Sequence, residues 1–268
     1  MTINENPDSQ HDSNTLDIEK LREQIKLKYR EVAITPDMEF HFHTGRKLAE
    51  KLGYSPQVID EVCATGVESF AGVGNPFSLR TITKGEKVVD VGSGAGFDSF
   101  VAASLVGDNG EVIGVDMTEE MLVKASRSAK EMSLDTVNFK EGIIEDLPIT
   151  DGWADAVISN GVINLCADKR AAFSEIFRIL KPGGYLQFAD IANSNPIPQA
   201  VIENIDLWTA WIAGGLPCAG WEKILRESGF QDIKIGEAVD TFGGASGEAN
   251  AKQFGVYGYA FLARKPDK

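Results

Sequence analysis

Cysteine and histidine are scarce in this chain, with three of each among 268 residues. Cys63, Cys166 and Cys218 lack the paired spacing of disulfide or redox motifs, so we expect a reducing, cytoplasmic environment. No apolar stretch approaches roughly 18 residues, so we expect no membrane-spanning helix. The first ten residues are polar and acidic, which is unlike a signal peptide.

Positive charge is also limited, because 26 Lys and Arg face 40 Asp and Glu for a formal net charge of −14. Nucleic acids and anionic membranes are bound by clustered basic residues, and the chain has no such cluster. We therefore expect neither partner, and a small-molecule substrate instead. The acidity is equally compatible with solubility or a saline habitat.

The most informative stretch is residues 87–97, where a valine-rich segment predicts a short buried strand. Asp90 lies near its end, and a helical pattern begins at Phe97 after a loop that contains Gly92, Ser93, Gly94 and Gly96. Closely spaced glycines permit a sharp turn and let a ligand approach the backbone. The helix N-terminus behind them offers unpaired N–H groups. The stretch therefore predicts a nucleotide site.

Asp90 favours one class of nucleotide. Its carboxylate would repel a pyrophosphate, whereas it suits S-adenosylmethionine (SAM), which carries an ammonium and a sulfonium and no phosphate. The spacing Gly92-x-Gly94-x-Gly96 is also tighter than the dinucleotide fingerprint. Asp116, about 20 positions after Gly96, suits hydrogen bonds to a ribose diol or, alternatively, a helix cap. SAM is the predicted ligand, and a generic Rossmann turn that binds NAD is the alternative.

Strand and helix patterns alternate after residue 86, which is typical of a doubly wound α/β sheet. We predict a Rossmann-like sheet of seven strands at 88–91, 112–115, 137–141, 154–159, 185–191, 232–237 and 257–262. We predict helices at 98–105, 118–132, 169–179, 199–211 and 220–228. The last two strands are joined without a clear helix, so we expect the last strand to run antiparallel.

The chain is expected to form one domain with a modest appendage. Residues 1–14 resemble a disordered tail. Residues 15–80 are predicted to form a helical lid, beginning with an amphipathic helix that crosses the ligand site or, alternatively, pairs with a partner helix. Residues 81–268 form the predicted SAM-binding domain, with a lid insertion at about 193–220.

Ligands of such sheets bind beyond the carboxyl ends of the strands. At these ends, Met117 and Ile144 are candidates to sandwich an adenine, although ordinary core packing is the alternative. Glu145 is a candidate acceptor for the adenine amine. Asn160 supplies a hydrogen-bonding side chain after the fourth strand.

His41 and His43 lie in a loop with Phe40 and Phe42, near the expected mouth of the site. They are candidates for a general base or for substrate-lining donors, because histidine titrates near neutral pH. Metal ligation and a purely structural role are the alternatives. With no further ligand nearby we expect no metal site.

The chain resembles class I SAM-dependent methyltransferases, and among these the bacterial arsenite methyltransferase branch. The resemblance is carried by residues 88–98, 114–121, 158–165 and 178–184, together with 53–55, 74–76 and 212–214, and spans roughly residues 25–237. It implies SAM contacts from Tyr29, Gly92, Gly94, Gly96, Asp116, Met117, Ile144, Glu145 and Asn160. Tyr29 would close over the sulfonium, because an aromatic face attracts a cation.

The arsenic-binding cysteines of that branch are replaced in this chain. Val73, Gly161, Trp211 and the segment 41–43 occupy the corresponding positions. Trivalent arsenic needs two or three convergent soft ligands. We therefore expect methyl transfer to a small soft nucleophile such as a thiol or sulfide.

Several alternatives stay open. They are O- or C-methylation of a small metabolite, arsenite methylation, and a catalytically silent SAM-binding protein. We expect a monomer or a homodimer.

Overall fold

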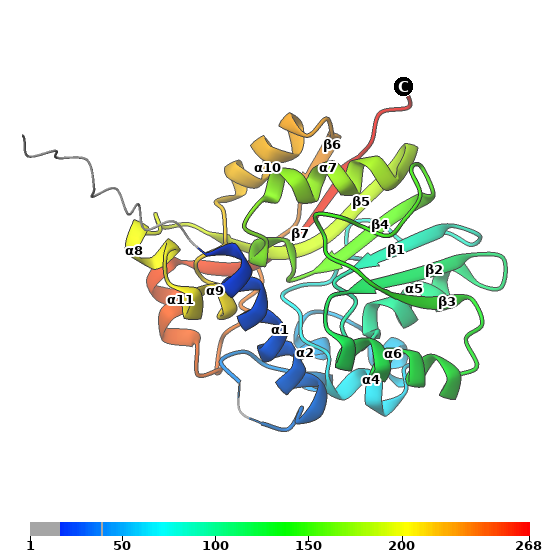
Figure 1. Ribbon diagram of the computed structural model, residues 1–268, viewed down its shortest axis with the longest axis horizontal. Helices are drawn as coiled ribbons and strands as arrows, with labels where there is room; N and C mark the ends of the chain where they lie inside the picture. The colour runs from blue at the N-terminus through cyan, green and yellow to red at the C-terminus, as the bar shows by residue number, and fades with distance from the viewer. Residues whose placement is uncertain (1–16, 39) are drawn as a thin grey trace, which may run out of the picture.

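The computed structural model describes residues 17–38 and 40–268 and is built on one seven-stranded sheet (Figure 1). The strand order is β3-β2-β1-β4-β5-β7-β6. The strands are β1 Lys87–Val91, β2 Glu111–Asp116, β3 Val137–Glu141, β4 Ala154–Asn160, β5 Leu180–Asn193, β6 Gln231–Ile235 and β7 Val256–Arg264. The predicted disordered tail at 1–14 lies outside the described residues.

The central strand, β1, pairs in parallel with β2 on one side and with β4 on the other. β5 continues parallel to β4, whereas β7 runs antiparallel to both β5 and β6. This arrangement confirms the predicted Rossmann-like sheet with an antiparallel last strand. The strand order reverses at β1 and β4, so the ligand crevice is expected beyond their carboxyl ends.

Alternate side chains of the central strands enter two different cores. Val89 and Val91 pack with α7 (Lys169–Ile179) and α10 (Cys218–Glu227) on one face of the sheet. Val88 packs on the other face with residues from α2 (Gly45–Lys51), α3 (Pro56–Asp60), α4 (Ala64–Glu68), α5 (Phe97–Val106) and α6 (Glu119–Glu131). Helices cover both faces of the sheet. This explains why the strands are rich in valine and do not alternate apolar with polar residues.

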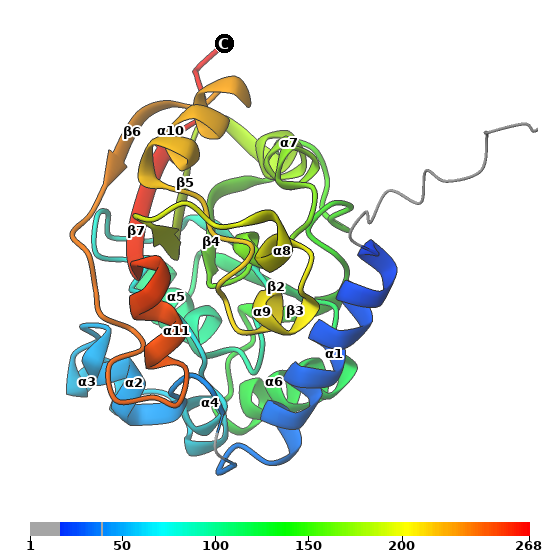
Figure 2. The same cartoon turned by 90° about the vertical axis from the view of Figure 1, so that its left-hand side faces the viewer.

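A third core lies beyond the carboxyl ends of the strands and joins α1 (Ile18–Ile34) to α9 (Ile205–Thr209) and α11 (Glu248–Phe254). Figure 2 shows α1 running diagonally beside α9, which follows α8 (Gln199–Ile202) in the chain. Asp17 caps α1 by accepting a hydrogen bond from the Lys20 N–H at 3.0 Å. Within the described ranges, neither α1 nor another helix is long and apolar enough to cross a membrane.

Two local predictions were wrong. The predicted helix at 199–211 is broken into α8 and α9, because the Asn204 side chain accepts from the Asp206 and Leu207 N–H groups and starts a new helix. The connection before β7 contains α11. The short helices α4 and η1 (Ile163–Leu165) were not predicted. The division into a lid at 15–80 and a domain at 81–268 stays a prediction.

Trp221 of α10 offers a test of the packing. It has no exposed surface, and its indole N–H donates to the Ile191 carbonyl at 2.9 Å. Trp221→Ala should lower the free energy of unfolding by about 3–5 kcal/mol, because it opens a cavity and leaves a buried carbonyl unpartnered. Lys223→Ala, whose side chain is 75% exposed on the same helix, should change it by less than about 0.5 kcal/mol. Urea unfolding measures both, and equal effects would contradict the described core.

Candidate functional site

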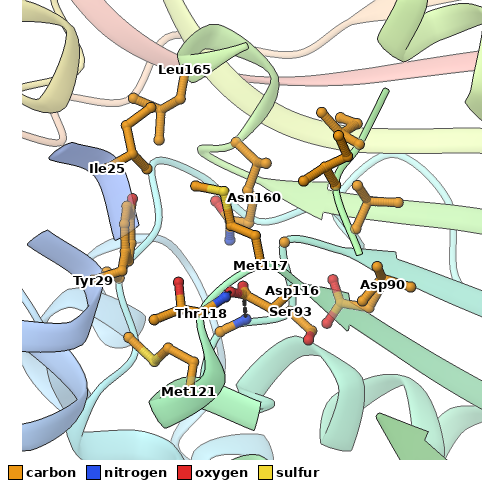
Figure 3. A pocket seen from close by; sticks show the side chains of 18 of the residues that line it. Ile25, Tyr29, Asp90, Ser93, Asp116, Met117, Thr118, Met121, Asn160 and Leu165 are labelled. Carbon is orange, nitrogen blue, oxygen red and sulfur yellow. Dashed lines mark hydrogen bonds between the residues drawn. The ribbon is translucent and has the colours of Figure 1, made fainter. Parts of the chain in front are cut away.

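The loop between β1 and α5 forms one wall of a pocket (Figure 3). Gly94 and Gly96 have φ angles of 51° and 92°, in the region that favours glycine. A Cβ on Gly94 would meet only the Met121 sulfur, at 4.0 Å, whereas a Cβ on Gly96 would lie 2.7 Å from the Phe100 ring. Gly94 therefore exposes backbone to the pocket, and Gly96 permits close packing of α5.

The pocket contains about 1110 Å³ of empty space, open solvent at its mouth included. Its walls come from the loop, from α1 and from the carboxyl ends of β1, β2 and β4 (Figure 3). The predicted nucleotide-binding residues that line it are Tyr29, Asp90, Gly92, Ser93, Gly94, Asp116, Met117, Ile144, Glu145 and Asn160. Gly96 lies behind the lining. The structure thus brings the predicted set together, while its role in binding stays a prediction.

Asp116 holds two neighbouring backbone segments, while its expected contact with a ribose stays a prediction. One carboxylate oxygen accepts from the Gly94 N–H at 2.9 Å, and the other accepts from the Thr118 N–H at 2.8 Å. The first bond fixes the glycine loop, and the second helps to start α6. Removal from water raises the pKa of Asp116, although these N–H groups oppose the shift.

Asp90 and Asp98 place two further carboxylates at the pocket. Asp90 accepts from the Ser99 hydroxyl at 2.6 Å, and Asp98 accepts from the Tyr54 hydroxyl at 2.5 Å. Burial raises the pKa of both, that of Asp90 further by repulsion from Asp98, and that of Asp98 to about 6. A positively charged ligand group would stabilise both carboxylates.

Asp98 and Tyr54 were not predicted as residues of the site. The only sequence signal for Asp98 was its position as an acidic residue in the first turn of α5. An acidic residue at such a position is equally well explained as a surface charge that interacts with the helix dipole. Tyr54 lies in the segment between α2 and α3, far from Asp98 in the chain. Their pairing is therefore a product of the tertiary structure.

Glu145 ties the far wall of the pocket to α1. Its Oε1 lies 3.2 Å from the Arg22 guanidinium and also accepts a hydrogen bond of 3.2 Å from the Cys166 thiol. Burial is the main cause of the raised pKa of Cys166, and the Glu145 charge adds to it. Cys166 is therefore a neutral donor rather than a thiolate. Neither Arg22 nor Cys166 was predicted to line the site.

Asn160 fixes the turn at residues 71–76. Its Oδ1 accepts from the Val73 N–H at 2.9 Å, and its Nδ2 donates to the Gly74 carbonyl at 3.0 Å. The same amide nitrogen donates to Asp98 at 3.0 Å. Ala71 of this turn lines the pocket.

His41 and His43 lie outside the residues that line the pocket. The Nε2 of His41 is 2.9 Å from the Thr209 carbonyl, and that of His43 is 3.1 Å from the Gly243 carbonyl. Burial lowers the pKa of His41 to about 4, so this ring is neutral at pH 7. The catalytic role expected of the two histidines stays a prediction that this geometry does not support.

Residues 82–231 match the family described as a methyltransferase domain. The chain belongs to this family. Arsenite methyltransferases from Halobacterium salinarum and Aquipseudomonas alcaligenes are 39% and 38% identical to it over 187 and 160 residues. These matches cover 70% and 57% of this chain but 48% and 46% of those proteins, so the chain spans about half the length of the curated relatives it matches.

A solved structure gives the same fold for this methyltransferase domain. It is an arsenic (III) S-adenosylmethionine methyltransferase from Chlamydomonas reinhardtii, with 31% identity and a TM-score of 0.63. The superposition covers 84% of this chain and 74% of that chain.

The fold also brings together the positions where, by the resemblance, arsenite methyltransferases carry arsenic-binding cysteines and this chain carries other residues. Trp211 is fully buried and stacks on Phe42, with ring centroids 4.4 Å apart. A Cβ on Gly161 would lie 3.5 Å from both the Trp211 ring and the Val73 side chain. The segments therefore meet in one apolar cluster of Phe42, Val73, Gly161 and Trp211, called the aromatic cluster below.

Asn160→Ala tests the coupling of the turn to the carboxylates. The substitution leaves the Val73 N–H and one Asp98 oxygen without their partner, so the free energy of unfolding should fall by about 1–3 kcal/mol. Asn138→Ala, at an exposed position of β3, should change it by less than about 0.5 kcal/mol. Thermal unfolding compares the two, and an unchanged Asn160→Ala midpoint would refute the coupling.

Proposed function

We propose that this methyltransferase domain transfers the methyl group of SAM to a small molecule. The observation that carries the proposal is the charge of the pocket, whose lining contains the carboxylates Asp90, Asp98, Asp116 and Glu145. The basic residue of the described lining is Arg22, and it is paired with Glu145. Such a lining favours a cationic adenosine ligand and disfavours a pyrophosphate, because charges removed from water need opposite partners.

The remaining lining fits the other parts of SAM. Asp116 offers a carboxylate for the ribose, and Met117 and Ile144 offer apolar faces for the adenine. The Ser93 hydroxyl is buried and has no hydrogen-bond partner among residues 17–38 and 40–268. A buried polar atom without a partner is uncommon, so this hydroxyl suits a polar group of the ligand.

SAM supplies, when bound, an electrophilic methyl group on a positively charged sulfur. The protein orients the reactants and excludes water, which can provide much of the acceleration of such a transfer. α1 lies across the pocket, and the Arg22–Glu145 pair holds it to the opposite wall. Tyr29 of α1 faces the cavity (Figure 3), where its ring can stabilise a cation.

We infer that the acceptor is a small soft nucleophile such as a thiol or sulfide. A thiol is partly ionised near neutral pH and needs little activation. The aromatic cluster supports an apolar acceptor of limited size. O- or C-methylation of a small metabolite is the alternative.

Arsenite is a second candidate acceptor, because the relatives named arsenite methyltransferases share this domain. Trivalent arsenic prefers two or three convergent thiolates. The aromatic cluster has no thiol at the corresponding positions. Arsenite is therefore a less favoured methyl acceptor than a small thiol.

Calorimetry and a labelled methyl donor test the proposed function on the full chain. We expect SAM and S-adenosylhomocysteine (SAH) to bind and NAD not to compete. Transfer of labelled methyl from SAM is then measured with thiols, sulfide, arsenite, phenols and amines. Binding of NAD that SAM cannot displace would overturn the proposal, and SAM binding without labelled product from the panel or a cell extract would identify a silent SAM-binding protein.

Proton release provides a sharper test of the carboxylate pair. Asp98, with a pKa raised to about 6, is partly protonated in the free protein near that pH, and a bound ammonium favours its ionised form. SAM affinity should therefore be full above the raised pKa and fall as the pH decreases through about 6. Calorimetry in buffers of different ionisation enthalpy should detect protons released on binding. Asp98→Asn should reduce this release, while Glu119→Gln, exposed on α6, should not; pH-independent binding by the unmodified protein would refute the assignment.

A further inference from the structure

Four buried polar atoms near the end of the sheet take no part in the pocket described above. They are the Oδ1 and Nδ2 of Asn164, the Oδ1 of Asn193 and the Nε1 of Trp211, none of which has a hydrogen-bond partner within the described part of the chain. Asn164 and Trp211 have no exposed surface, and Asn193 is 4% exposed. Unpartnered buried amides and indoles are unfavourable by about 1–3 kcal/mol each, so their grouping indicates a ligand.

The three side chains lie around the segment 211–216. Gly214 approaches Asn164 so closely that a Cβ there would lie 1.9 Å from the Asn164 carbonyl oxygen. A Cβ on Gly215 would lie 3.3 Å from the Asn193 Oδ1. The segment therefore covers the unpartnered atoms, and its two consecutive glycines provide the backbone freedom to uncover them.

A carboxylate lies at the same place. Asp190 of β5 is fully buried and accepts from the Asn164 N–H at 3.0 Å and the Ile191 N–H at 2.7 Å. No basic side chain in the described ranges lies within ion-pair distance of it. Burial raises the pKa of Asp190 to about 6, a value suited to accepting a proton near neutral pH.

The charged and titratable groups that face Asp190 are Lys169 and Tyr29. The Lys169 ammonium donates to the Asn164 and Cys166 carbonyls at 3.1 and 2.9 Å and lies 5.0 Å from the Trp208 ring centroid. Burial lowers the pKa of Lys169 to about 8. Asp190 is thus held by backbone N–H groups, with the Asn164 side chain and the buried Lys169 cation nearby rather than a direct ionic partner.

The group adjoins the SAM pocket. Leu165 and Cys166, which directly follow Asn164, line the pocket, as does Tyr29. The Tyr29 phenol lies near the Trp211 indole, without a hydrogen bond to it, and near the charge of Asp190; removal from water is the main cause of its raised pKa. Tyr29 therefore stands between the pocket and the unpartnered atoms.

We propose that Asn164, Asp190 and Trp211 form the subsite for the methyl acceptor, and that this acceptor is a small molecule with one hydroxyl or thiol on an apolar body. The inference rests on the proposed methyl transfer from SAM. The Asn164 amide and the Trp211 N–H hold the polar group, and the neighbouring aromatic cluster holds the apolar body. Asp190 is the proton acceptor.

The step balances with SAM as the sole co-reactant. The proton of the acceptor O–H or S–H passes to Asp190, and the electron pair of that heteroatom forms the bond to the methyl carbon. The bond between this carbon and the sulfur of SAM breaks, and its electron pair stays on sulfur, which gives SAH. Asp190 returns the proton to solvent when the segment 211–216 uncovers the site.

Binding of 4-nitrophenol to the SAH-saturated protein tests the subsite without catalysis, because its absorbance reports its ionisation. We expect binding, weakened about tenfold in Asn164→Ala through loss of a buried hydrogen bond. The free energy of unfolding of Asn164→Ala should not decrease, because the substitution removes an unpartnered amide. Unchanged binding, or a loss of stability without a change in binding, would show that the amide serves the fold or a buried water and would overturn the inference.

Transfer of labelled methyl to 4-nitrophenol and 4-nitrothiophenol tests Asp190. We expect Asp190→Asn to slow transfer to the phenol by about 100-fold or more, to slow transfer to the more acidic thiol less, and to leave SAH affinity unchanged. Asp206→Asn, an exposed position of α9, is the matched control and should keep the full rate. An unchanged rate in Asp190→Asn refutes the inference. Binding of SAH without binding of 4-nitrophenol refutes this subsite alone, whereas absence of SAM and SAH binding refutes the proposed function.

Discussion

Buried carboxylates at the carboxyl edge of the sheet determine which side chains must surround the pocket and which ligand charge it favours. Asp90 is the penultimate residue of the central strand, and Asp98 faces the same pocket from the first turn of α5. Each needs hydrogen-bond donors in place of water, and these come from Ser99, Tyr54 and Asn160. These neutral donors complete the hydrogen bonds of the carboxylates but do not neutralise their negative charge. The pocket therefore retains a preference for a cation. The segment that carries Tyr54 is thereby part of the site rather than an appendage to it.

The cover of the pocket is assembled from opposite ends of the chain. α1 reaches the far wall through Arg22 and Glu145, and the loop after α1 reaches the segment near 205–216 through Phe42 and Trp211. His41 joins the same two parts by its hydrogen bond to the Thr209 carbonyl. These contacts give the histidine loop a place in closing the site, and the aromatic cluster occupies the space next to the pocket with apolar groups. Under the proposed function, an acceptor bound beside this cluster would meet mainly apolar groups.

The fold followed from local patterns, with limited exceptions. Valine-rich strands, glycine turns and helical periodicity predicted the seven strands of a doubly wound sheet, because these patterns reflect interactions within a few residues and the burial of both sheet faces. The wrong secondary-structure predictions lie at positions where a single contact decides the local structure. Asn204 splits a predicted helix by capping its second half, and α11 forms in a stretch whose glycines favoured a loop.

The sequence by itself determined the chemistry of the first wall of the site, from Asp90 through the glycine loop to Asp116. These residues lie at strand ends whose place is fixed by the fold rules, so their proximity could be inferred before any coordinates. The tertiary structure alone decided which distant side chains join them. Asp98 meets Tyr54, Glu145 meets Arg22, and Asp190 meets Asn164 through contacts between residues far apart in the chain. No local pattern encodes such contacts, because they depend on how whole elements pack.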